Sequence, residues 1–198
     1  MKFFKDNSYD IVRLFINQVG ITIFSLVLYT AVGFVEDSKL SLTLKVVLSI
    51  FSTAFYFSLL YTVAWDYGSK DQLKIESGKY QISKYKGIFL GLFSNALNFI
   101  LTGLCSLSIG IYMLNNQDWL FTAFGILNLI MRFILAMYLG MIQGLTSGLA
   151  GNVDYLCESL AYVIFPLFAV FFVAFGYSMG LKNKRLFSSA RGPMGQGK

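Results

Sequence analysis

The chain has 198 residues, of which 56% are hydrophobic and only 13% are charged, and its mean hydropathy is +0.64. An ordinary soluble domain has about 25% charged residues and could not bury this much apolar surface, so the composition excludes that class. Twenty Phe and twelve Tyr beside only two Pro also exclude a disordered chain. The formal net charge is +6.

Five long apolar runs divide the chain and predict its membrane segments. They cover residues 11–35, 41–64, 87–113, 119–148 and 160–181. Each is near or above the ~20 residues that a helix needs to cross a hydrocarbon layer of ~30 Å. Uninterrupted runs of this length fit helices, not the alternating strands of a barrel. The sequence therefore predicts an all-α, polytopic helical membrane protein: one bundle over 1–181 with about five transmembrane helices, then a flexible basic tail over 182–198.

The first run has some features of a signal peptide, because Lys2 and Lys5 precede it and Ala31 and Gly33 form a small-x-small pair. Its apolar stretch is longer than a signal peptide requires, and further spans follow it. We expect an uncleaved membrane anchor.

Basic side chains in the short connecting segments predict the orientation. The loop over 66–86 holds five lysines, the N-terminus holds Lys2, Lys5 and Arg13, and the tail holds five more basic residues. Cytoplasmic segments of membrane proteins are enriched in Lys and Arg, so we expect all three on the cytoplasmic side. In general character the sequence resembles small bacterial membrane proteins, which implies the bacterial cell membrane.

The fourth run creates a conflict with this orientation. Five complete spans put the two chain ends on opposite sides, yet the segments around Asp118 and around Asp154 and Glu158 lack Lys and Arg and both look external. The conflict disappears if residues 119–158 enter and leave the membrane from one side. No Pro or Gly lies between Gly125 and Gly140 to make such a turn, so five spans with a cytoplasmic N-terminus is the main prediction, and a re-entrant fourth segment is the alternative.

Polar residues in the third and fourth runs form the candidate site. Arg132 lies about 20 Å along a helix that starts at Trp119, and Asn128 is one turn earlier on the same face. In the third run, Asn95, Asn98 and Thr102 share a helix face. No carboxylate is evident within the runs to neutralise Arg132, which favours a polar pathway for an anionic solute. In the alternative interpretation Arg132 snorkels to the headgroups and the asparagines join helices.

Gly140, Gly144 and Gly148 lie four residues apart in the fourth run. In a bilayer, small residues at this spacing let helix backbones approach closely. They predict a helix-packing surface, whether against a second copy, a partner subunit or the same chain.

The sequence offers little for catalysis. It has no His, which removes the commonest general base and the usual zinc ligands, and it lacks nucleotide-binding and hydrolase motifs. We expect no enzyme activity, no catalytic or metal site and no cofactor. Asp66 and Asp71 could hold Mg²⁺ on a lipid pyrophosphate; alternatively they are solvated loop charges, paired with Lys70 near a turn at Gly68.

These observations predict a small channel or transporter protomer, in a homo-oligomer or beside a membrane partner subunit. The alternative is a scaffold or regulatory subunit that packs on a partner through its Gly-x₃-Gly helix, and a lipid-modifying enzyme is third. Membrane lipids are expected partners. Nucleic acid is not, because orientation and attraction to anionic lipid account for the basic segments.

Overall fold

The computed structural model describes residues 2–78, 85–147 and 152–184, and every regular element in these ranges is helical. In chain order the elements are α1 (Lys2–Gly33), α2 (Ser38–Glu76), α3 (Lys86–Ser94), α4 (Ala96–Asn115), α5 (Asp118–Ile134), the 3₁₀ helix η1 (Ala136–Tyr138), α6 (Leu139–Thr146) and α7 (Asn152–Leu181). The predicted all-α class is confirmed.

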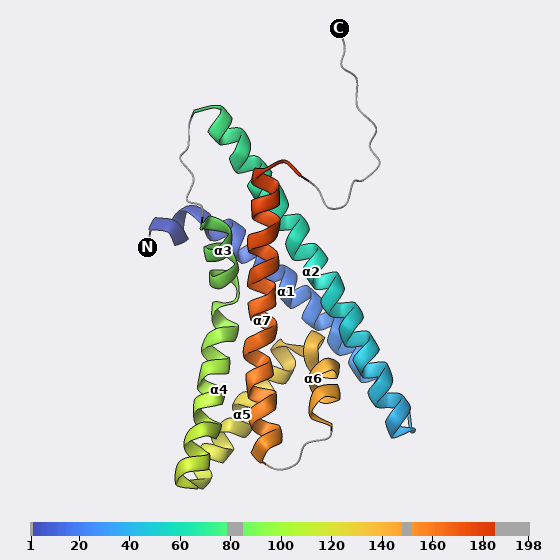
Figure 1. Ribbon diagram of the computed structural model, residues 1–198. Coiled ribbons are helices and arrows are strands. Elements are labelled where there is room, and N and C mark those ends of the chain that lie inside the picture. The colour runs from blue at the N-terminus through green and yellow to red at the C-terminus, as the bar shows by residue number, and fades with distance from the viewer. Residues whose placement is uncertain (1, 79–84, 148–151, 185–198) are drawn as a thin grey trace.

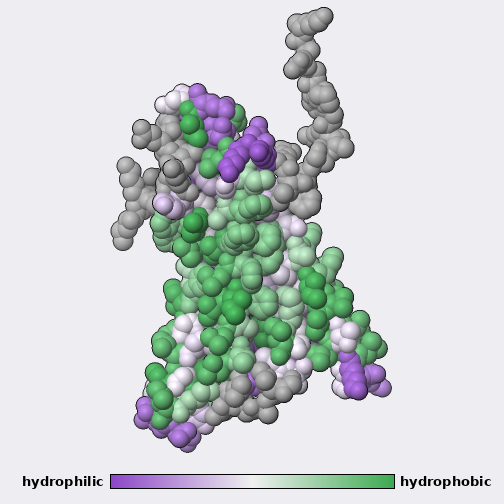
Figure 2. All heavy atoms as spheres, in the orientation of Figure 1, coloured by the Kyte–Doolittle hydropathy of each residue, from purple (hydrophilic) through white to green (hydrophobic). Residues whose placement is uncertain are grey.

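Among the described residues, four helices are long and apolar enough to cross a membrane: α1 from Asn7 onward, α2, α4 and α7. The bent pair Asp118–Ile134 and Ala136–Thr146 passes the same test only when its two parts are taken together. Large apolar side chains are exposed along all four, and Figure 2 shows an apolar surface between two polar ends. A monomeric soluble protein rarely exposes so wide an apolar surface. The chain is a polytopic helical membrane protein.

The predicted runs agree with these helices in three places and differ in two. Residues 11–35 and 41–64 correspond to α1 and α2, and 160–181 lies in α7, which begins earlier, at Asn152. The run 87–113 is divided at Asn95 between α3 and α4. The run 119–148 is not one continuous helix.

This fourth run forms two short helical arms, which we call the re-entrant pair (residues 118–146). The second arm, η1 with α6, is bent by 84° from α5. Figure 1 shows α5 rising from the end where α4 stops, and α6 returning toward that same end, where α7 starts. The structure thus corresponds to the re-entrant alternative, with both ends of the pair on one side of the bundle.

The bend occurs at Leu135 without Gly or Pro, because hydroxyls from other helices satisfy the backbone groups that it frees. The Thr22 hydroxyl donates to the Ile134 carbonyl (2.9 Å), and the Thr53 hydroxyl donates to the Met137 carbonyl (3.3 Å). Ser49 Oγ accepts from the Gly140 N–H at 2.7 Å. Broken backbone at membrane depth is stable only where such partners exist. Side chains of α1 and α2 therefore determine where the fourth run breaks.

The two ends of the bundle differ in charge. Where α1 begins, α2 ends and α7 ends, the described residues include Lys70, Lys74, Lys86, Lys182 and Lys184; we call this the basic end. The opposite end, where the re-entrant pair begins and ends, includes Asp118 and Asp154 and is called the acidic end.

The prediction that residues 66–86 form a loop is wrong for residues 66–76, which belong to α2. With 39 residues α2 is about 58 Å long at ~1.5 Å per residue, so it projects beyond a ~30 Å layer and continues to Glu76.

The predicted turn at Gly68 is also wrong, because Gly68 lies within α2 and packs on α7. A Cβ at Gly68 would lie 3.0 Å from Gly180 Cα, and one at Gly176 would lie 2.6 Å from the Tyr61 carbonyl oxygen. Small residues thus bring α2 and α7 into backbone contact.

Candidate functional site

Arg132, in the last turn of α5, forms a bidentate ion pair with Glu158 of α7. Its Nε donates to Oε1 at 2.9 Å and its Nη2 donates to Oε2 at 3.1 Å. The expectation that no carboxylate would neutralise Arg132 is wrong. It treated Glu158 as part of a connecting segment, whereas α7 begins six residues earlier and carries Glu158 against α5.

Two further donors fix the Glu158 carboxylate. Asn128 Nδ2 donates to Oε2 at 3.0 Å, and the Tyr162 hydroxyl donates to Oε1 at 2.8 Å. Asn128 therefore joins Arg132 in one cluster, as its position one turn earlier predicted. The Glu158 side chain is 6% exposed and the Arg132 side chain is 45% exposed. One member of the pair is enclosed, and the other is accessible.

Two cavities meet at the Arg132 side chain. The first, of about 250 Å³, has aromatic walls from α5 and α7 formed by Phe121, Phe124 and Tyr155. The second, of about 340 Å³, is mainly polar and is lined by residues of α6 and α7 together with Leu42 of α2. We call it the polar cavity. Arg132 can therefore contact a small molecule in either cavity while it stays bound to Glu158.

The polar residues of the third run contact other partners. Asn95 lies at the break between α3 and α4, where its Nδ2 donates to the Gly91 carbonyl at 3.0 Å. Asn98 Nδ2 donates to Gln18 Oε1 of α1 at 3.0 Å, and the Thr102 hydroxyl donates to the Tyr162 carbonyl at 3.4 Å. The bonds of Asn98 and Thr102 join α4 to α1 and α7, whereas that of Asn95 stays at the end of α3. Of the three residues, Thr102 comes nearest to the Arg132 cluster, through the backbone of Tyr162.

The two aspartates at the basic end bind different lysines. Asp71 Oδ2 is 2.6 Å from Lys86 Nζ, with the two side chains 4% and 7% exposed, and it also accepts from the Tyr177 hydroxyl at 2.9 Å. Lys74 approaches the other carboxylate oxygen at 3.3 Å. Asp66 pairs with Lys70 at 2.7 Å on the exposed surface. The structure therefore does not join Asp66 and Asp71 in one site.

Two of the three predicted packing glycines contact α2 of the same chain. A Cβ at Gly140 would collide with the Lys45 carbonyl, and one at Gly144 would lie 2.8 Å from Val46 Cγ2. Gly148 lies outside the described residues. At Gly140 and Gly144, the packing surface is used within the chain.

Sequence reasoning missed Glu158 and Tyr162 as members of the site. A signal was present, because Asp154, Glu158 and Tyr162 are spaced by four residues and share one face if the helix starts before them. That start could not be placed, since the apolar run becomes continuous only near residue 160.

The fold and the cluster define a polytopic helical membrane protein with a charged pair at the inner end of its re-entrant region. Comparison with protein-family models, with curated proteins and with solved structures finds no match to this chain.

Proposed function

We propose that this chain is a protomer of a membrane transport protein, a channel or a carrier, in which Arg132 binds an anionic group of the solute. The observation that carries the proposal is that Arg132 is fixed by Glu158 yet remains nearly half exposed and lines two cavities. A guanidinium presents its donors in a rigid fork that matches carboxylate and phosphate groups.

The energetics of the bilayer support a functional role. An arginine within a membrane segment costs at least ~2.5 kcal/mol on insertion scales. A residue that raises the cost of insertion in this way commonly marks a functional site. A pair with a solely structural role can be fully enclosed, as Asp71 and Lys86 are. Packing alone does not explain why the Arg132 side chain stays 45% exposed.

The broken fourth run supports the same proposal. Interrupted helices that meet inside the bilayer commonly surround the solute sites of transporters. Because the described residues include four complete spans, a pathway fits best at the axis of a homo-oligomer or beside a partner subunit. Because short basic segments favour the cytoplasm, we propose that the basic end and the N-terminus are cytoplasmic, in a bacterial cell membrane.

The scaffold alternative loses its main support. It depended on the Gly-x₃-Gly helix as a free packing surface, whereas Gly140 already contacts Lys45 and Ser49 of α2. The lipid-modifying enzyme depended on Asp66 and Asp71, which are each bound to a lysine.

The test is flux in liposomes. Purified protein would be reconstituted, and uptake of acetate, chloride and inorganic phosphate would be measured for the natural chain, Arg132→Lys and Arg132→Gln. Lys70→Gln, at an exposed pair, is the control. We expect uptake of at least one anion, reduced at least tenfold by Arg132→Gln, less by Arg132→Lys, and unchanged by Lys70→Gln. Equal uptake by all variants that fold, or no uptake of any probe, would contradict the proposal.

A further inference from the structure

The first of the two cavities at Arg132 follows one face of α5, and we call it the aromatic cavity. Its lining residues Phe121, Gly125, Leu129 and Arg132 recur at spacings of four, four and three, so they lie on one side of the helix. From the first to the last of them this face extends about 16 Å at ~1.5 Å per residue. Tyr155 of α7 also lines the cavity.

The walls of the aromatic cavity and its Arg132 end differ in chemistry. Tyr155 packs edge to face on Phe121 and on Phe124, with ring centroids 5.7 and 5.5 Å apart. These rings make the walls apolar and aromatic. At the other end, the two hydrogen bonds of Arg132 to Glu158 leave further N–H groups of the guanidinium for a ligand. Because the Glu158 side chain is only 6% exposed, the accessible part of this pair is the cation.

Gly125 keeps the middle of the aromatic cavity open. Within the described part of the chain, a Cβ at Gly125 would have no side chain within 4 Å apart from those of its two neighbours. Close helix packing therefore does not require a glycine here, in contrast to Gly140, and glycine lowers helix stability relative to other residues. A larger side chain at Gly125 would take up space that the cavity now offers to a ligand.

The volume of the aromatic cavity suits one ring with a charged group. The cavity measures about 250 Å³. An engineered protein cavity of about 150 Å³ is large enough to bind benzene. The aromatic cavity therefore has space for a six-membered ring and for a carboxylate beside Arg132.

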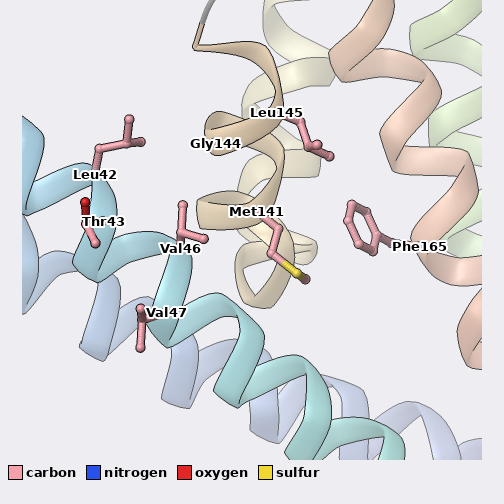
Figure 3. Close-up of a pocket in the computed structure, with 8 residues that line it drawn as sticks. All are labelled: Leu42, Thr43, Val46, Val47, Met141, Gly144, Leu145 and Phe165. Carbon is pink, nitrogen blue, oxygen red and sulfur yellow. The ribbon is translucent and has the colours of Figure 1, made fainter.

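A larger hollow elsewhere on the bundle lacks a charged end. This apolar groove, of about 510 Å³, is lined by residues of α2, α6 and α7, and Figure 3 shows Val46, Leu145 and Phe165 among them. None of the described residues that line it is charged. An apolar molecule can enter the groove, but no lining group there would select a carboxylate. The groove is therefore an internal control for binding at Arg132.

We infer that the aromatic cavity binds a small aromatic monocarboxylate, such as benzoate. The carboxylate accepts hydrogen bonds from the guanidinium N–H groups of Arg132 that Glu158 does not use, and such charge-assisted bonds are strong. The ring packs against Phe121 and Tyr155 over Gly125, in the edge-to-face or offset arrangements that aromatic rings prefer. Binding of the carboxylate rests on the proposed function of Arg132, and the aromatic walls name the class of solute.

The test is equilibrium binding of radiolabelled benzoate to the purified full chain in detergent, at neutral pH, where benzoate is ionised. Three unlabelled molecules compete with it. Acetate lacks the ring, benzyl alcohol lacks the carboxylate, and octanoate replaces the ring with a flexible chain that loses conformational freedom on binding. We expect one benzoate per chain, displaced by each competitor only at concentrations at least about tenfold above those of unlabelled benzoate.

Two variants and two matched controls locate the site. Arg132→Gln removes the cation and Gly125→Leu fills the cavity, so each should weaken benzoate binding at least tenfold. Gly103→Leu is the control for a glycine replacement, because Gly103 is exposed on α4 and a Cβ there also meets open space. Leu145→Trp fills the apolar groove instead. Neither control should change binding, and Gly125→Leu keeps the test valid if Arg132→Gln does not fold.

Absence of benzoate binding, equal displacement by octanoate, or unchanged binding in Gly125→Leu would overturn the inference. Loss of binding in Leu145→Trp would also overturn it, because the ligand would then occupy the apolar groove.

The result is separable from that of the flux assay. Benzoate binding that depends on Arg132 and Gly125, without uptake of any soluble anion, would support the aromatic site and contradict transport. Uptake of acetate, chloride or phosphate that depends on Arg132, without benzoate binding, would overturn the aromatic site and support the transport proposal alone.

Discussion

Among the described residues, two ion pairs join different helices, and they differ in what surrounds them. Asp71 and Lys86 join α2 to α3 at the basic end, and both side chains are enclosed by protein. Arg132 and Glu158 join α5 to α7, and only the carboxylate is enclosed. Charge within an apolar bundle therefore does not by itself identify a functional site. Access to one member of the pair is the distinguishing feature.

The contacts of each pair agree with this distinction. Asp71 also accepts a hydrogen bond from Tyr177 of α7, so a single carboxylate connects three helices. At the other pair, Asn128 and Tyr162 hold Glu158 while Arg132 reaches two cavities. The first pair stabilises the bundle, and the second presents a guanidinium.

The largest expected effect on stability is that of Asp71→Asn. The change removes the carboxylate of the buried pair with Lys86, and breaking a buried pair in this way costs about 3–5 kcal/mol. We expect the free energy of unfolding, measured by denaturant titration in mixed micelles, to fall by that amount. Asp66→Asn is the matched control, because its exposed pair with Lys70 should contribute under ~1 kcal/mol. Equal losses for the two variants would contradict the enclosure of Asp71.

Glu158→Gln should destabilise the protein less, by about 1–2 kcal/mol. The glutamine still accepts and donates hydrogen bonds, and the half-exposed Arg132 can turn toward solvent or headgroups. The same titration measures the change. A loss of unfolding free energy as large as that of Asp71→Asn would contradict the difference in enclosure between the two pairs.

The hydroxyls at the Leu135 break should have a smaller effect. Ser49→Ala removes the acceptor of the Gly140 N–H, which should cost about 1 kcal/mol and expose that amide to faster hydrogen exchange. Ser58→Ala is the control, since the Ser58 hydroxyl bonds only the Ala54 carbonyl of its own helix. An unchanged exchange rate at Gly140 in Ser49→Ala would show that the break does not depend on α2.

Much of the fold could be predicted from local composition, because lipid requires long apolar runs wherever the chain crosses. Composition identified the α1, α2, α4 and α7 regions. It could not decide the course of the fourth run, since the break at Leu135 depends on Thr22, Ser49 and Thr53, which are distant in sequence. The loop-charge conflict was the one sequence signal for it.

The site was predictable only where its residues lie on one helix. Arg132 and Asn128 share a helix face within one run, so their proximity follows from helix geometry. The partner Glu158 comes from another helix, whose polar first turns resemble a connecting segment. Asn95 and Asn98 were expected on one face of a continuous helix, whereas Asn95 lies at the break between α3 and α4, and only the tertiary arrangement shows that Asn98 meets Gln18.

The most direct test compares anion uptake for Glu158→Gln and Asp71→Asn in liposomes, with rates expressed per folded molecule. We expect Asp71→Asn to retain the natural rate despite its lower stability, because its pair joins α2 to α3 at the basic end, away from the proposed site. We expect Glu158→Gln to lower the rate at least tenfold, because Arg132 loses the carboxylate that orients it. An unchanged rate in Glu158→Gln, or an equal loss per folded molecule in both variants, would contradict the account.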